Sequence, residues 1–201
     1  MQQDGKADDA NALTLRSLVG WQTAPLHNFS VGAQLISVAV FDNDYDNRDK
    51  GVPQPGRGSF PVIADPDATG VNQLYVDWTG VRNTRLRAGR QSVKLDNVRF
   101  VGNVEFRQVM QVFDGVSAEN KGLLPDTTVF VAHFNRVTQV STLQQDTAIS
   151  IVNARYGISP TENLVGYGYF VGWDAASLQP TSSRTVGVRL DGVRPLTPDW
   201  K

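Results

Sequence analysis

The sequence predicts an all-β fold: an antiparallel up-and-down meander that forms part of a transmembrane β-barrel. Three observations lead to this prediction. Apolar and polar residues alternate with a period of two along much of the chain, and helical periodicity is hard to find. The connections between the alternating segments are by turns short and long. Most of these segments hold about 9–13 residues, which is enough to cross a bilayer at a tilt of about 35–45°.

Nine segments have the composition of strands, because they are rich in Val, Thr, Tyr, Phe and Leu and are bounded by Gly, Pro, Asn and Asp. In the first segment Leu13, Val19 and Trp21 share one face, while Thr14 and Arg16 point to the other. The second segment is apolar on both faces, so its sides are not assigned. The expected strands are residues 12–22, 29–41, 71–79, 84–91, 109–119, 127–135, 146–157, 163–173 and 184–194.

The connections indicate how the strands are arranged. Short turns are expected at 23–28, 80–83, 120–126 and 158–162, and longer connections at 42–70, 92–108, 136–145 and 174–183. Tight turns at one end of a meander and long polar loops at the other are typical of bacterial outer-membrane barrels. We therefore expect 42–70 and 92–108 to be long loops on the outer side of the barrel.

A soluble β-sandwich or jelly roll is the alternative architecture. Two details favour the barrel. The apolar face often ends in an aromatic residue that suits an interfacial girdle, and the opposite face is polar, as a water-filled lumen allows. The girdle residues would be Trp21, Phe41, Trp78 and Trp173. The alternative function is a secreted carbohydrate-binding β-sandwich, in which Trp78, Trp173 and Tyr167 would form a flat sugar platform.

Composition excludes several classes of function. Lys and Arg (19) nearly balance Asp and Glu (20), so charge gives no reason to expect nucleic acid as a partner. The chain has no cysteine and two distant histidines, which argues against thiolate and histidine metal sites. We find no nucleophile motif and no specific carboxylate pair. The expectation is therefore a protein that is not an enzyme and needs no cofactor.

The stretch "FDNDYDNRD" at 41–49 is a weak candidate metal site. Asp42, Asp44 and Asp46 match the first, third and fifth positions of a helix–loop–helix calcium loop. Asn47 stands where that loop has glycine, and Pro53 stands where it has the bidentate glutamate. Strands rather than helices flank the stretch. We expect it to be the solvated, acidic start of an outer loop.

One long run carries a family resemblance. Residues 71–115 contain "TRLRAGRQ", "LDNVRFVG", "FRQ" and "FDG", preceded by "IADPDATG" and followed by "LPDTT" at 124–128. This run resembles the alginate-export family of outer-membrane β-barrel porins, and the resemblance extends more loosely over the whole chain. It implies a single barrel domain over residues 1–201, located in the bacterial outer membrane. Membrane lipid and lipopolysaccharide would be its partners, and its oligomeric state is open.

The resemblance also implies that the chain is an N-terminal portion, truncated at both ends. Single-chain bacterial barrels have an even number of strands, whereas nine are expected here. Members of the family begin with a signal peptide, and the first ten residues, "MQQDGKADDA", lack the apolar core of one. We expect that signal to have been lost by truncation.

An arginine-lined pore is the expected site. Such a pore attracts anions and suits passive passage of anionic solutes, or export of an alginate-like polyuronate. The alternative for each arginine is pairing with a neighbouring carboxylate across the sheet. The 92–108 connection is long enough to fold inward and constrict the pore. The expected pore-lining residues are, first, Arg87, Arg90, Arg99 and Arg107, and then Arg155, Arg189, Asp96 and Asp114.

Overall fold

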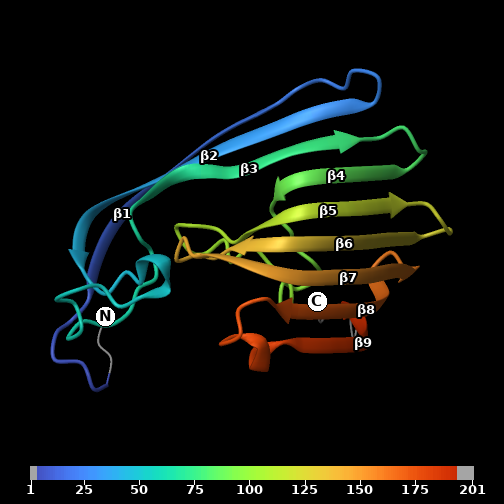
Figure 1. Ribbon diagram of the computed structural model, residues 1–201. Helices are drawn as coiled ribbons and strands as arrows, with labels where there is room; N and C mark the ends of the chain where they lie inside the picture. The colour runs from blue at the N-terminus through green and yellow to red at the C-terminus, as the bar shows by residue number, and fades with distance from the viewer. Residues whose placement is uncertain (1–3, 194–201) are drawn as a thin grey trace, which may run out of the picture.

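The computed structural model describes residues 4–193, which form one antiparallel sheet of nine strands in chain order (Figure 1). Two short 3₁₀ turns, η1 (Asp49–Gly51) and η2 (Gln179–Thr181), lie in the connections. No helix in the described residues is long and apolar enough to cross a membrane. The strands are β1 (Asn11–Gln22), β2 (Phe29–Asp44), β3 (Ala68–Trp78), β4 (Thr84–Gln91), β5 (Val112–Lys121), β6 (Thr127–Thr138), β7 (Gln144–Ser159), β8 (Glu162–Trp173) and β9 (Ser183–Gly192).

Each strand pairs with its neighbours in the chain, which confirms the predicted all-β meander. The sheet is open within the described residues, because β1 and β9 do not pair with each other. The tight turns lie on one side of the sheet and the long connections on the other (Figure 1). This arrangement agrees with the alternation of short and long connections in the sequence.

At the long-loop side the strand ends differ from those expected from the sequence: β2 and β3 are longer there, and β5 is shorter. Asn11 pairs with Asp44, and Val38 pairs with Ala68, so the connection between β2 and β3 is residues 45–67 rather than 42–70. The next long connection is residues 92–111 rather than 92–108, because β5 begins at Val112. Arg194, expected at the end of the last strand, lies outside the described residues.

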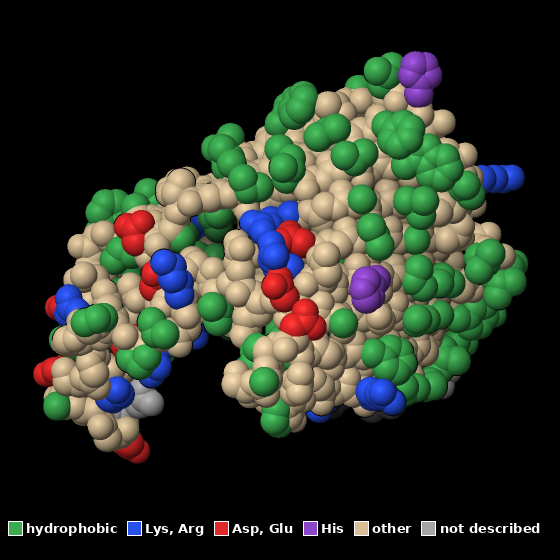
Figure 2. Space-filling model, in the orientation of Figure 1, with side chains coloured by type: hydrophobic (Ala, Val, Ile, Leu, Met, Phe, Trp, Pro, Cys, Tyr) green, Lys and Arg blue, Asp and Glu red, His purple; other side chains and the backbone are tan. Residues whose placement is uncertain are grey.

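One face of the sheet is apolar and exposed, and we call it the apolar face. On β9 it carries Val186, Val188 and Leu190, whose exposed fractions are 74%, 72% and 67%. On β4 it carries Leu86 and Ala88, which pair with apolar residues of β5. Figure 2 shows apolar side chains spread over this face along β4–β9. Soluble proteins rarely expose a continuous apolar surface of this kind.

The opposite face, which we call the inner face, is covered in part by residues 92–111, the inner loop. Val93 and Val101 of this loop are buried against Phe113, Phe134 and other side chains of β5–β8. Further along the loop, Val109 is buried against β2. Both of these hydrophobic clusters therefore lie between the inner loop and the sheet.

The aromatic residues expected to form a girdle do not all lie on the same face of the sheet. Trp21 and Trp78 lie on the apolar face, where Trp78 contacts Phe29 at 6.3 Å between ring centroids. Trp173, with Tyr167, Tyr169 and Val171, lies on the inner face, because the inner loop supplies apolar partners for that face of β8. Trp78 and Trp173 consequently point to opposite sides of one sheet. The flat sugar platform of the alternative function is therefore not formed.

Candidate functional site

The inner loop is fastened to the sheet by a buried carboxylate, Asp96. Its backbone has a positive φ of 55°, and its side chain is 10% exposed. Asp96 Oδ2 accepts hydrogen bonds from Asn153 Nδ2 at 2.8 Å and from the Tyr169 hydroxyl at 3.2 Å. These donors come from β7 and β8, where each occupies an inward position of the alternating strand. The carboxylate thus ties the loop to two neighbouring strands.

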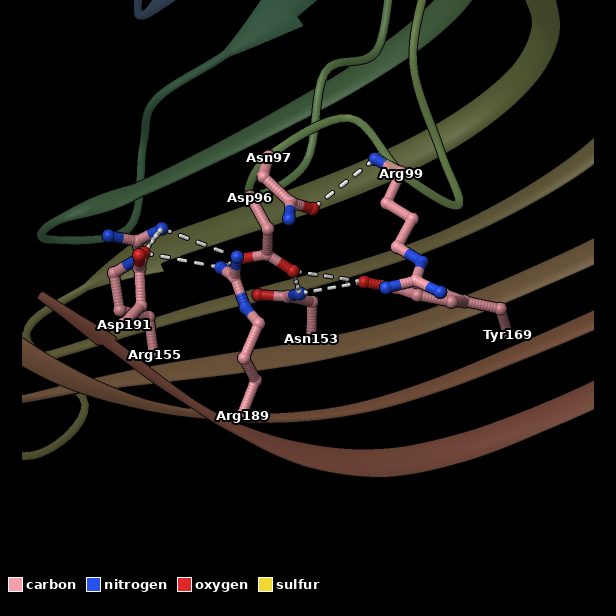
Figure 3. A network of polar contacts seen from close by, with 8 residues as sticks. All are labelled: Asp96, Asn97, Arg99, Asn153, Arg155, Tyr169, Arg189 and Asp191. Atoms are coloured by element: carbon pink, nitrogen blue, oxygen red, sulfur yellow. Dashed lines mark hydrogen bonds and ion pairs between the residues drawn. The ribbon is translucent and has the colours of Figure 1, made fainter.

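Two arginines complete this group, the Asp96 cluster, as Figure 3 shows. Arg155 of β7 and Arg189 of β9 each place Nη2 at 3.4 Å from Asp96 Oδ1. The same nitrogens lie 3.6 Å and 3.2 Å from Asp191 Oδ2. Two cations therefore face two carboxylates, and the formal charges of the cluster cancel. Arg155, Arg189 and Asp96 are all expected from the sequence to line the pore, and the structure brings the three together.

Arg99 stands on the inner loop beside this cluster, and its side chain points toward Tyr169 (Figure 3). Its guanidinium lies 5.7 Å from the ring centroid of Phe100. The guanidinium takes part in no ion pair within residues 4–193, and the residue is exposed. Phe100 packs on Tyr167 and Tyr169 at centroid distances of 5.6 Å and 5.9 Å. Arg99 therefore presents an unpaired positive charge next to an aromatic patch.

Arg87 lies on the inner face but is fully engaged. Its Nε and Nη2 donate to the two carboxylate oxygens of Asp77 at 2.6 Å and 2.7 Å. Its guanidinium also lies 3.5 Å from the ring centroid of Tyr75, and its side chain is only 13% exposed. A bidentate pair of this kind is among the strongest ion pairs in proteins. Arg87 agrees with the alternative reading, in which arginine pairs across the ladder.

Arg107 anchors the far end of the inner loop. It lies 3.8 Å from Asp65, whose Oδ1 also accepts the backbone N–H of Gln108 at 2.9 Å. From β1, Arg16 Nη1 donates to the carbonyl of Arg107 at 2.8 Å. The inner loop is thus held at β7–β9 by Asp96 and near β1 by Arg16. It crosses a large part of the inner face.

The prediction that Arg90 and Asp114 line the same face as Arg87 is wrong. Arg90 follows Leu86 and Ala88 on β4, and it pairs with Asp114 of β5. Strands alternate their side chains between two faces, so Arg90 lies on the apolar face whereas Arg87 lies on the inner face. The alternation in "TRLRAGRQ" contains this information. The prediction failed because it rested on the position of Arg90 within the run 71–115 and not on its place in the alternation.

The weak metal candidate Asp42, Asp44 and Asp46 does not form a site. Within the described residues, no group of three or more His, Asp or Glu side chains is placed to hold a metal ion. Asp42 and Asp44 still belong to β2, and Asp44 pairs with Arg57 at 2.9 Å. Asp46 is 1% exposed rather than solvated, because it accepts the backbone N–H groups of Arg48 and Gln54.

Two titratable groups outside the strands have shifted pKa values. Burial raises the pKa of Tyr45, and the nearby carboxylates of Asp65 and Asp67 raise it further. The Tyr45 hydroxyl donates to the carbonyl of Asp65 at 2.8 Å, so it helps to fasten the 45–67 connection. On the inner loop, the hydrogen bond from Lys94 lowers the pKa of Glu105. Both groups therefore keep their usual charge near neutral pH.

The sequence analysis did not identify Asn153, Tyr169 or Tyr75 as residues of the site. The sequence indicates little about them, because the identity of a polar or aromatic residue on a strand does not show which distant loop will contact it. Asn153 gives one hint, since it occupies an inward position between Ile151 and Arg155 on β7. Such a polar residue among buried neighbours requires a hydrogen-bond partner.

No protein-family model and no curated protein matches the chain. Among solved structures, the chain is similar to the crystal structure of Pseudomonas aeruginosa OccK8 (OprE), with a TM-score of 0.58 and 14% sequence identity. The match covers 82% of this chain and 45% of that chain, so this chain spans less than half of the length of that protein. The resemblance to the alginate-export family in particular finds no support in these comparisons. At this identity the likeness concerns the fold alone: the chain shares an antiparallel β-meander with that protein.

Proposed function

We propose that the chain forms part of the wall of an outer-membrane porin, through which anionic solutes pass by diffusion. One observation carries this proposal: the inner loop folds across the inner face and presents Arg99 there without an ion-pair partner in the described residues. The porin-like fold supports the proposal. In this account residues 1–201 are a single domain and the long connections face outward, as the sequence analysis expects.

The two faces of the sheet suit lipid on one side and water on the other. The apolar face exposes Val186 and Val188, whereas their neighbours Thr185, Gly187 and Arg189 point inward. Alternation of apolar and polar residues along a strand is the signature of a transmembrane barrel strand. We accordingly place the protein in the bacterial outer membrane, with membrane lipid and lipopolysaccharide as partners.

The selectivity of this pore would depend on Arg99 more than on a ring of arginines. Of the four arginines first expected in the pore, Arg87 is neutralised by Asp77, Arg90 lies on the apolar face, and Arg107 lies near Asp65. Arg99 is the remaining one. An unpaired guanidinium on a constricting loop attracts anions and makes two parallel hydrogen bonds to a carboxylate. The substrate class that fits is a small solute with a carboxylate or phosphate group.

Export of an alginate-like polyuronate is the second candidate function. The resemblance of residues 71–115 to the alginate-export family favours it, and a polyuronate carries the carboxylates that Arg99 would contact. The two candidates differ in the size of the permeating molecule. Block of ion current by alginate oligomers, compared with single uronate sugars, separates them: export of the polymer requires that the oligomers enter the pore.

Planar-bilayer conductance of the natural full-length protein tests the main proposal. We expect Arg99→Gln to lower the anion-over-cation permeability ratio by about two- to fivefold, since one charge near a surface is worth about 1 kcal/mol to an ion of opposite sign. The matched control is Arg184→Gln, which removes an exposed arginine from the apolar face and should leave the ratio unchanged. Failure of the protein to form channels, or an unchanged ratio in Arg99→Gln, would overturn the proposal.

A further inference from the structure

Four alternating charges cross the apolar face at the long-loop ends of β4–β7. Arg90, Asp114, Arg136 and Asp146 are register partners from one strand to the next, and we call them the charge ladder. Arg90 donates to both carboxylate oxygens of Asp114 at 2.7 Å and 2.8 Å, and Arg136 Nε donates to Asp146 at 2.9 Å. Figure 2 shows basic and acidic side chains gathered here, beside the apolar area.

The charge ladder ends an apolar band whose height matches a membrane. On β7 the residues of this face after Asp146 are Ala148, Ser150, Val152 and Ala154, followed by Tyr156. Ser150 is hydrogen-bonded to His133 at 3.0 Å, so its hydroxyl is satisfied within the band. Ten positions separate Asp146 from Tyr156, which is about 34 Å along a strand and about 26 Å at a tilt near 40°. The apolar band of outer-membrane barrels is about 25 Å tall.

Arg136 is the member of the charge ladder that is open to a ligand. Its side chain is 46% exposed, compared with 21% for Arg90. Only its Nε has a hydrogen bond within the described residues, so both Nη groups retain their donors. The bidentate pair of Arg90 and Asp114 stands beside it on β4 and β5. A planar guanidinium with free Nη donors, held by one carboxylate, is suited to bind a phosphate.

The geometry points to the charge ladder as a binding site for the phosphate groups of an anionic lipid headgroup in the outer leaflet, with Arg136 as the main contact. This inference rests on the proposed function, because it requires the apolar face to lie in a bilayer. Continuity with the apolar band argues for lipid as the occupant: acyl chains would lie on the band below, and the headgroup would lie at the level of the ladder. Anionic lipid attracts an arginine that lies near the membrane surface.

The test measures lipid binding by the natural full-length protein in phosphatidylcholine vesicles, with and without lipid A. Lipid A should raise the thermal midpoint of unfolding of the parent protein, and lipid A freed of its phosphates should raise it less. We expect Arg136→Gln to bind lipid A about fivefold more weakly and to lose most of the shift that depends on phosphate. Its midpoint in phosphatidylcholine alone should change little, because the ion pair with Asp146 is exposed.

A matched control removes the same charge from the inner face. Arg85 is 43% exposed and pairs with Glu119 at 3.4 Å, so it resembles Arg136 in exposure and in having one arginine–carboxylate pair. It lies on the inner face, at the short-turn end of β4, away from the charge ladder. Arg85→Gln should keep the full response to lipid A. An equal response in both variants, or an equal response to lipid A without phosphates, would overturn the inference. In either case the protein still inserts and conducts, whereas a protein that does not insert at all contradicts the proposed function itself.

Discussion

Asp96 is the residue on which the position of the inner loop depends most. Its carboxylate contacts side chains from three strands, and its positive φ places it at a tight bend of the loop. Arg155 and Arg189 would otherwise share the single carboxylate of Asp191. Replacement of Asp96, which is 10% exposed, would leave these two partly exposed arginines with one carboxylate between them, and this lowers the stability of the docked loop. Asp96 therefore positions the loop that carries Arg99.

We expect Asp96→Asn to weaken docking of the inner loop by about 1–3 kcal/mol, because two partly exposed arginines lose a shared carboxylate. Limited proteolysis of the full-length protein should cut the inner loop faster, and single-channel current should fluctuate more. Glu105→Gln is the control on the same loop: Glu105 is 60% exposed, and its solvent-exposed pair with Lys94 contributes little to stability. Equal cleavage rates in both variants would show that Asp96 does not hold the loop.

At the scale of the strand, two glycines set how closely β3, β4, β5 and β6 approach. Gly89 and Gly115 are register partners on the inner face. A Cβ on Gly89 would collide with the Leu74 carbonyl oxygen and lie 2.9 Å from the Cα of Tyr75. A Cβ on Gly115 would lie 2.7 Å from the Cα of Phe134. Backbone atoms cannot move aside as a flexible side chain can, so these positions require glycine.

Gly89→Ala should therefore destabilise the sheet by about 1–3 kcal/mol, since its φ of 122° is unfavourable for alanine in addition to the collision. The loss is measurable as a lower urea midpoint for unfolding of the full-length protein from vesicles. Gly166→Ala provides the comparison, because a Cβ there meets nothing within 4 Å and the residue lies on the apolar face of β8. A drop of the same size in Gly166→Ala would contradict the role of close backbone approach.

The strands could be predicted from the sequence because their pattern is local. Period-two alternation locates β4 at 84–91, the bounds that the structure has, and it finds all nine described strands. The errors lie at strand ends, as at Asp42 and Asp44, where pairing with β1 continues through polar residues that carry no apolar signal. Residues 109–111 belong to the inner loop and not to β5, and the alternation does not reveal this. Val109 is apolar because it is buried against β2, which is distant in the sequence.

The candidate site could be predicted only in part, because it depends on contacts between distant residues. Asp96 meets Arg155 and Arg189 across long sequence separations, and nothing local indicates that these three side chains come together. The inner loop also reverses the expected role of Tyr167 and Trp173, since it turns their side of β8 into buried surface. Parity along each strand would have placed Arg90 correctly. The partner of each charged side chain can be identified only from the folded structure.

For the whole molecule, the central claim is that one sheet separates lipid from water. The apolar face exposes aliphatic side chains up to the charge ladder, and the inner face carries the Asp96 cluster and Arg99. The proposed selectivity, the docking of the inner loop and the proposed lipid binding each belong to one of these two faces. Adjacent residues on a single strand must therefore contact different solvents, and β9 offers the clearest series of such neighbours.

Side-resolved labelling of β9 tests this claim most directly, because the chain has no native cysteine. The experiment introduces one cysteine at a time into the full-length protein, at Thr185, Val186, Gly187 or Val188. Each variant is inserted in vesicles and treated with a charged maleimide that does not cross the membrane. We expect Thr185→Cys and Gly187→Cys to react through the aqueous pore. Val186→Cys and Val188→Cys should be protected from this reagent and should instead show quenching of an attached fluorophore by brominated lipid. Equal reaction of all four cysteines with the charged maleimide would contradict the account.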